Sequence, residues 1–526
     1  MPQKAVATPK GPPPTYQSLP GYDAAGASGS ASHADVNHSG HGEADGLLGG
    51  QSEKFNRSPA YKDVWATVLF IVHLGLLVAL TVAGYKVTIP EAQPETPPPS
   101  RHRPDHQRLY ESPATEPSVP IGNYPALSDA GPIFAAAILG GFGFSVLYVI
   151  AMRRYASQLI TASFVANTLV AGVLGLFYLV SGAMIPAFFA LAYAAIHVFM
   201  YFMYRSRMEF SRVMLENVIN IVDQYRATFV ASLLGAVVQT FWVLTWLVSA
   251  IAGARLVQAT DNDAAKYAVI TYITFSLYWT SQIIKNVVHV TVSGVFATYY
   301  FTAIQTADGS VVVPVRNPTI KSAKRALTTS FGSIAFGSLI VALIQTLRAV
   351  LNTVRRNAQD DNNSALALAA TCADCILSMI EAFVAFINVY AYTQVAIFGK
   401  SYLEAGRDTW ALLQSRGIDL IINDDLTSGV LSMGGILVAF VSGTLGYLLG
   451  LIKDYSPPMI WALAAVGFVS GLLQFWVLAE VVRSGIATTF VCLAEDPDAL
   501  QRTKPQMYEE FAQSYPASVR SGEYGV

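Results

Sequence analysis

Long apolar runs separated by short polar stretches follow one another along most of the chain. An α-helix needs about 20 consecutive apolar residues to cross a bilayer core of about 30 Å, and about ten runs reach or approach that length. Charged residues, prolines and glycines gather at the boundaries between the runs. The pattern predicts an all-α, polytopic membrane protein with about ten transmembrane helices, embedded in the lipid bilayer. The approximate limits of the predicted spans are 64–85, 131–152, 158–181, 184–204, 227–253, 267–290, 327–347, 375–398, 427–451 and 459–480.

The composition supports a membrane protein and argues against several other classes. Hydrophobic residues make up 53% of the 526 residues and charged residues 13%, whereas soluble domains carry about 25% charged residues. The net charge of −2 gives no reason to expect nucleic acid as a partner. The sequence contains no phosphate-binding glycine-rich loop, no zinc-protease motif and no serine-hydrolase elbow. We therefore expect neither an ATP-driven pump nor an enzyme, and no metal or cofactor.

Basic residues next to the spans predict the orientation, because cytosolic loops carry an excess of Lys and Arg. They place both termini in the cytosol and the loop at 90–130 outside. The chain then divides into a disordered cytosolic tail rich in Pro, Gly and Ser (1–60), a transmembrane domain (61–490) and a cytosolic C-terminal tail (491–526). The residues that carry this bias are Lys54, Arg57, Lys62, Arg153, Arg154, Arg205, Arg207, Arg212, Arg316, Lys321, Lys324, Arg325, Lys400, Arg407 and Arg416.

Three segments between spans have amphipathic patterns. Those at about 207–226 and 400–424 are expected to be cytosolic helices on the membrane surface. A third group, Arg348, Arg355 and Arg356, follows the seventh span and would lie outside. Its apolar face predicts a helix lying in the interface. The alternative is a re-entrant seventh segment, which would reverse the orientation of everything after it.

Short motifs suggest a binding partner and modifications. Pro13, Pro14 and Tyr16 fit Pro-Pro-x-Tyr, a ligand of WW domains, and predict a WW-domain ubiquitin ligase as partner; a chance match in a Pro-rich coil is the alternative. Asn362 begins a glycosylation sequon that the predicted topology places outside. Cys372 and Cys375 have the spacing of a redox pair, and either a local disulfide or two unpaired buried thiols would fit.

Glu381 is the most unusual residue within the predicted spans. A charge at the centre of a membrane helix costs roughly 2.5–3.5 kcal/mol on insertion scales. At helical spacing, Ala385, Asn388 and Tyr392 share its face, together with Ser378. Such a face cannot contact lipid favourably, so we expect it to line a path for a small cation. Alternatively, Glu381 is protonated and holds neighbouring helices together.

Two earlier spans carry polar and aromatic residues on one face. Aromatic faces beside a carboxylate are the usual means of holding a quaternary ammonium group. Aromatic residues near helix ends can instead form an interfacial belt. The predicted substrate-binding residues are Glu381, Asn388, Tyr392, Trp242, Trp246, Gln239, Tyr278 and Trp279.

Other polar residues of the spans are expected to have structural roles. Lys285 and His289 should lie near the cytosolic interface with their polar ends extended to water. Glu480 is expected to form an interfacial ion pair with Arg483 at the end of the last span. Gly332 and Gly337 predict a hinge or a close helix contact in the seventh span.

Four stretches resemble the choline transporter-like family, especially its fungal "pH nine-sensitive" branch. They are Phe331-Gly-Ser-Ile-Ala-Phe-Gly-Ser, Asn388-Val-Tyr-Ala-Tyr392, Phe398-Gly-Lys-Ser-Tyr402 and Arg483-Ser-Gly-Ile-Ala-Thr-Thr-Phe490. The resemblance implies a ten-span bundle with cytosolic termini that moves choline or a related amine without ATP. It also implies a multi-pass protein of the plasma membrane, with endosomal or vacuolar membranes as other locations. The alternatives are transport of another solute such as ethanolamine, or a membrane scaffold that transports nothing.

Overall fold

The computed structural model describes residues 60–87, 127–182, 184–305 and 311–496, together with 501, 508 and 509. All helices described below belong to the unit Gln51–Val526. The tail motif at Pro13, Pro14 and Tyr16 lies outside the described residues, as do most of the loop at 90–130 and most of the C-terminal tail.

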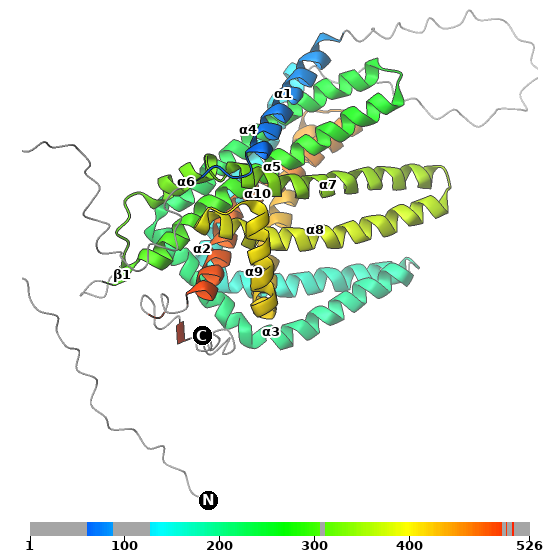
Figure 1. The fold of residues 1–526 in the computed structure, drawn as a ribbon. Helices are drawn as coiled ribbons and strands as arrows, with labels where there is room; N and C mark the ends of the chain where they lie inside the picture. Colours follow the sequence, from blue (N-terminus) through cyan, green and yellow to red (C-terminus); the bar gives the residue numbers. More distant parts are fainter. Residues whose placement is uncertain are drawn as a thin grey trace, which may run out of the picture. The chain divides into compact units, whose positions relative to one another are not determined.

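Ten α-helices and one small two-stranded sheet form the described part of the chain (Figure 1). This architecture confirms the predicted all-α membrane fold. The helices are α1 (Val64–Lys86), α2 (Leu127–Val180), α3 (Met184–Gln224), α4 (Arg226–Ala259), α5 (Asp263–Thr302), α6 (Pro318–Leu327), α7 (Phe331–Asp360), α8 (Ser364–Phe398), α9 (Tyr402–Ile452) and α10 (Pro457–Glu495), and the antiparallel strands are β1 (Ile304–Gln305) and β2 (Val311–Val312).

Within the described residues, seven helical segments have the length and apolar composition of a membrane span. The predicted spans at 158–181, 184–204 and 267–290 are helical but are not among these seven, so the count of ten remains a prediction. α2 changes direction at Tyr155, whose φ of −126° and ψ of 32° are not helical. The kink falls between two predicted spans.

Several helices continue beyond the apolar runs that predicted them. α7 is one continuous helix of 30 residues, about 45 Å long at 1.5 Å per residue. The prediction of a separate interfacial helix around Arg348, Arg355 and Arg356 was therefore wrong, because these arginines form the second half of α7. The predicted amphipathic segments likewise belong to longer helices, the first mostly to α3 and the second mostly to α9.

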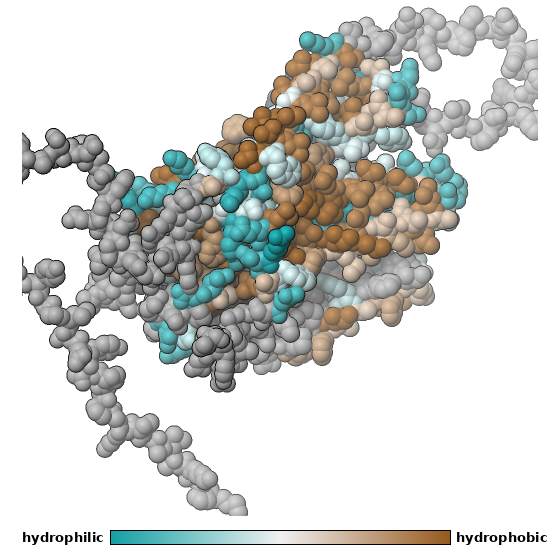
Figure 2. Space-filling view, in the orientation of Figure 1, coloured by the Kyte–Doolittle hydropathy of each residue, from teal (hydrophilic) through white to brown (hydrophobic). Residues whose placement is uncertain are grey.

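Helices that are consecutive in sequence pack as antiparallel pairs, including α4 with α5, α7 with α8, and α9 with α10. α5 also packs against α7, α8 and α10, so it lies among three other long helices. Hydrophobic residues cover the surface over α1, α7 and α8 in Figure 2, whereas hydrophilic residues lie at the turn between α7 and α8. Leu368, Ile376 and Met379 are among the exposed apolar residues of α8, which fits a face in contact with lipid. Following the predicted orientation, we call the end with the α7–α8 turn the outer end, and the opposite end the inner end.

The start of α1 is tied to the starts of α7 and α9 at the inner end. Asp63 has a left-handed backbone conformation with a φ of 49°. Its Oδ2 accepts hydrogen bonds from Ser333 Oγ at 2.7 Å and from the backbone N–H of Tyr402 at 2.8 Å. Gly332 lies directly against the Asp63 carbonyl, where a larger residue would collide with backbone atoms. One carboxylate thus joins three helices that are far apart in sequence.

We expect the substitution Gly337→Ala to destabilise the protein, because an added Cβ would overlap the Tyr402 ring and the Tyr392 hydroxyl. Overpacking of this kind typically costs about 1–3 kcal/mol. Gly75→Ala in α1 is the matched control, since no atom lies within 4 Å of the Cβ position there. Thermal unfolding of the purified protein in detergent measures both. Equal melting temperatures for the two variants would contradict close packing at Gly337.

Candidate functional site

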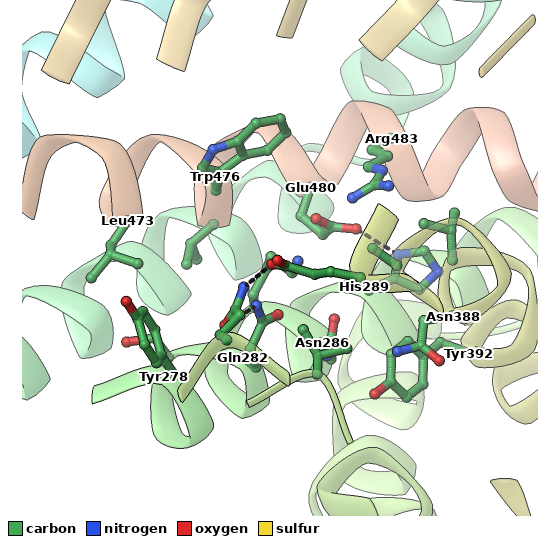
Figure 3. Close-up of a pocket in the computed structure, with 18 of the residues that line it drawn as sticks. Tyr278, Gln282, Asn286, His289, Asn388, Tyr392, Leu473, Trp476, Glu480 and Arg483 are labelled. Atoms are coloured by element: carbon green, nitrogen blue, oxygen red, sulfur yellow. Dashed lines mark hydrogen bonds and ion pairs between the residues drawn. The ribbon is translucent and has the colours of Figure 1, made fainter. Parts of the chain in front are cut away.

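A cavity of about 340 Å³ lies between α5, α7, α8 and α10 (Figure 3). Its volume falls within the range of about 300–1,000 Å³ that is usual for small-molecule sites. Polar and aromatic side chains from α5, α8 and α10 converge on it. The polar and aromatic residues that line it are Tyr278, Ser281, Gln282, Lys285, Asn286, His289, Gln345, Glu381, Asn388, Tyr392, Trp476, Glu480 and Arg483.

Glu381 lies at the midpoint of α8, with 17 residues of the helix before it and 17 after it. Its side chain is 18% exposed and faces the cavity. One carboxylate oxygen accepts a hydrogen bond from Gln345 Nε2 at 2.8 Å, and the other forms an ion pair with the Arg348 guanidinium. Gln282 donates in turn to Gln345 Oε1 at 3.4 Å. This group forms the outer layer of the cavity.

Arg348 is shared between two carboxylates on α8. Its Nε donates to Asp374 Oδ1 at 2.9 Å, while another nitrogen of the same guanidinium contacts Glu381. Glu381 lines the cavity, whereas Asp374 does not. The two acids are seven residues apart, so they lie on one face of the helix about two turns from each other. The guanidinium therefore bridges a carboxylate inside the cavity and one outside it.

A buried contact between a histidine and a carboxylate forms the inner layer. His289 Nδ1 lies 2.6 Å from Glu480 Oε1, and both side chains are only 1% exposed. The other ring nitrogen of His289 lies 3.1 Å from Thr393 Oγ1. These contacts connect α5, α10 and α8. Gln282 and His289 are seven residues apart on α5, so the outer and inner layers are separated by about 10 Å.

Two predictions for this region were wrong. Glu480 does not form an interfacial pair with Arg483; its partner is His289, inside the bundle. His289 does not extend to the interface, because it is held between Glu480 and Thr393. The sequence offers little signal for the pairing, since the two residues are 191 positions apart.

Tyrosines and asparagines complete the inner end of the cavity. The Tyr402 hydroxyl donates to Asn388 Oδ1 at 2.5 Å. Asn286 donates to Ser338 Oγ at 2.9 Å, and that hydroxyl lies 3.3 Å from the Tyr392 hydroxyl. Because Tyr402 is also held through its backbone by Asp63, the cavity is linked to the contact that joins α1, α7 and α9.

Four of the eight predicted substrate-binding residues meet at the cavity, namely Tyr278, Glu381, Asn388 and Tyr392. Gln239 on α4 does not line the cavity, but its amide donates to Ser281 Oγ at 2.9 Å, and Ser281 does. Of the helical face predicted on α8, Glu381, Ala385, Asn388 and Tyr392 line the cavity, whereas Ser378 does not.

The three predicted tryptophans lie away from the cavity. Trp279 is 1% exposed and donates its indole N–H to the Ala335 carbonyl at 3.1 Å, while its ring packs against Phe70 on α1. Trp246 donates to the Ile273 carbonyl at 2.9 Å, and Trp242 is likewise absent from the lining. Trp476 on α10 is the tryptophan that lines the cavity. Sequence reasoning missed it because helical spacing shows which residues share a face but not which helix the face meets.

The remaining predicted sites lie near the turn between α7 and α8 or along α8. Asn362 is an exposed turn residue with a φ of 56°; its glycosylation stays a prediction. Cys372 and Cys375 are both free and exposed, so neither the local disulfide nor the burial of the thiols is seen. In the part of the chain that the structure describes, no group of three or more His, Cys, Asp or Glu residues could hold a metal ion.

Comparison with known proteins places these helices in a family. A family model described as plasma-membrane choline transporter matches residues 188–498, which include the four helices that line the cavity. A CTL-like protein of Dictyostelium discoideum is 32% identical over 469 residues, covering 87% of this chain and 76% of the relative. Protein PNS1 of Gibberella zeae is 30% identical over 479 residues, covering 87% and 83%, and protein PNS1 of Mycosarcoma maydis is 30% identical over 393 residues, covering 72% of each chain. The resemblance noted in the sequence is confirmed, and the chain belongs to the plasma-membrane choline transporter family.

Proposed function

We propose that the protein is an ATP-independent transporter, facilitative or secondary, of a small solute with an ammonium group, choline or a related amine. The observation that carries the proposal is the polar cavity between four long helices, with the Glu381 carboxylate at the midpoint of one of them. The family name supports choline as the type of solute and the plasma membrane as the location. Transport would proceed by alternating access around this cavity.

The outer layer has the chemistry that an ammonium group requires. A quaternary ammonium has no N–H to donate, so it is held by aromatic faces and by a nearby carboxylate. Tyr278 and Trp476 supply aromatic rings at the cavity, and Glu381 supplies the carboxylate. Figure 3 shows Tyr278 and Trp476 on different helices that border the same space.

Access of a cation to Glu381 depends on Arg348, which already pairs with that carboxylate. A guanidinium without a partner inside a membrane helix bundle is costly. Asp374 removes much of that cost, because Arg348 can keep its 2.9 Å contact there while it releases Glu381. If the ammonium group of the solute replaces Arg348 at Glu381, the contact between α7 and α8 changes. Solute binding would thereby be coupled to movement of these helices.

Contacts at the inner end of the cavity would have to separate for a solute to leave on that side. His289, Glu480 and Thr393 connect three of the lining helices. Below them, Tyr402 is held to Asp63 through its backbone and to Asn388 through its hydroxyl. Release of a solute to the inner side requires both groups of contacts to separate, which makes them the inner gate in this proposal.

A scaffold that transports nothing is the second candidate. The observation that favours it is that Glu381 already has a complete set of polar partners, Gln345 and Arg348. In that case Glu381 only joins α7 to α8. Asp263 at the start of α5 is an exposed carboxylate outside the cavity, so comparing its neutralisation with that of Glu381 separates the two candidates.

We expect Glu381→Gln to lower the specificity constant for uptake of labelled choline into proteoliposomes at least about tenfold, because a neutral amide cannot act as a counter-charge. Asp263→Asn neutralises an exposed carboxylate at the start of α5, outside the cavity, and should keep uptake within about threefold, corresponding to less than 1 kcal/mol. Melting temperatures of both variants, measured on the same preparations, show whether the fold is retained.

Two results would contradict transport. A loss of uptake in Glu381→Gln that is matched by a loss of folded protein would assign Glu381 to helix contacts alone. The absence of saturable, protein-dependent flux of choline or ethanolamine in the unmodified protein would overturn the transporter proposal itself.

The inner ion pair leads to a separate prediction on stability. His289→Leu leaves Glu480 as a buried carboxylate without its partner, and breaking a buried pair in this way costs about 3–5 kcal/mol. The double substitution His289→Leu with Glu480→Leu removes both polar groups and should recover most of that loss. Thermal unfolding in detergent tests the comparison. A double variant no more stable than His289→Leu would show that the pair is not the source of the loss.

A further inference from the structure

Lys285 brings a second ammonium group into the cavity proposed for an ammonium solute. It lies on α5 between the two layers, three residues after Gln282 and four before His289, and it lines the cavity. Within the described residues, its ammonium forms neither a hydrogen bond nor an ion pair. Arg348, by contrast, contacts two carboxylates. Lys285 is thus a cation that faces the cavity without a partner.

The position of Lys285 in its helix argues against the expected role as an interfacial residue. In α5, 22 residues precede Lys285 and 17 follow it. Its neighbours Asn286 and His289 are 5% and 1% exposed. A lysine near a membrane surface can extend its ammonium into water. Lys285 instead lines the cavity between its own helix and α7, α8 and α10.

Arg483 supplies another unused donor close to Lys285. Its Nε is buried and has no hydrogen-bond partner among the described residues. It follows Glu480 by three residues on α10, and Figure 3 shows the two side chains next to each other above His289. Lys285 lies within electrostatic reach of Arg483 and of both cavity carboxylates.

The inner half of the cavity has more positively charged groups than negatively charged ones. Glu381 pairs with Arg348, and one oxygen of Glu480 contacts His289, while the second oxygen of Glu480 has no hydrogen-bond partner among the described residues. The cationic groups that lack a full set of partners are Lys285 and Arg483. A solute carrying only positive charge would be attracted by the outer layer and repelled by Lys285.

We infer that the solute of this cavity is a short zwitterion, with an ammonium group at one end and a carboxylate at the other. The ammonium lies in the outer layer near Tyr278, Trp476 and Glu381, and the carboxylate accepts hydrogen bonds from Lys285 and Arg483. The inference rests on the proposed transport of an ammonium solute and narrows the class of that solute. Gln282 and Lys285 are three residues apart, about 4.5 Å along the helix axis. A linker of one or two carbons between the charged groups fits that separation.

Choline and glycine betaine form a matched pair of probes. Both carry a trimethylammonium group, but choline ends in a neutral hydroxyl and glycine betaine in a carboxylate. Calorimetric titration of the purified full-length protein in detergent measures their binding. We expect glycine betaine to bind at least about tenfold more tightly than choline, since charged hydrogen bonds to Lys285 and Arg483 replace a repulsion.

Two variants of α5 test the assignment to Lys285. Lys285→Gln should abolish the preference for glycine betaine, because the cationic donor is lost. Lys266→Gln is the matched control: this lysine lies on the same helix and pairs with Asp263 at 3.0 Å, outside the cavity. It should leave the preference unchanged. If Lys285→Gln does not fold, the ratio of the two affinities in the unmodified protein still decides the inference.

The inference is overturned if choline binds the unmodified protein as tightly as glycine betaine, or if folded Lys285→Gln keeps the preference. Uptake of labelled choline and labelled glycine betaine into proteoliposomes tests transport independently of the binding preference. Preferential binding of glycine betaine without flux would support the zwitterion site and contradict transport. Saturable uptake of choline with no binding or uptake of glycine betaine would support transport and overturn the zwitterion.

Discussion

The cost of an unpartnered charge inside a membrane is the constraint on which the centre of this protein depends. Removing one member of a buried ion pair costs about 3–5 kcal/mol, several times a typical hydrogen bond. Glu381 meets the constraint through Arg348, which reaches it from the neighbouring helix, and Glu480 meets it through His289. Each pair joins residues of different helices. The helices that line the cavity are therefore held in register by charges as well as by packing.

The exceptions to this rule show where the interior is adapted to something other than its own stability. Lys285, Arg483 Nε and the second oxygen of Glu480 lack partners among the described residues. All three residues line the same cavity. A bundle selected only for stability gains nothing from leaving such groups unsatisfied. Their convergence on one space is a stronger indication of a ligand site than Glu381, whose oxygens are both occupied.

The fold class and one side of the site could be predicted from the sequence, because both depend on local spacing. Apolar length predicts spans, and the 3.6-residue period places Glu381, Asn388 and Tyr392 on one face, and all three line the cavity. The partners of that face could not be predicted. His289 and Glu480 are 191 residues apart, and a spacing pattern carries no information on which helices meet. For the same reason Trp279 was assigned to the solute, although its indole serves a helix contact.

A zwitterionic solute also makes the charge arrangement of the cavity intelligible as a whole. The solute has no net charge, so its entry leaves the sum of charges in the low-dielectric interior unchanged. Its ammonium competes with Arg348 for Glu381, and Arg348 can remain with Asp374. Its carboxylate pairs with Lys285, which has no partner otherwise. Among the described residues, Lys285 and Arg483 are the cavity cations that lack a full set of partners, and the carboxylate of the bound solute supplies a partner for both.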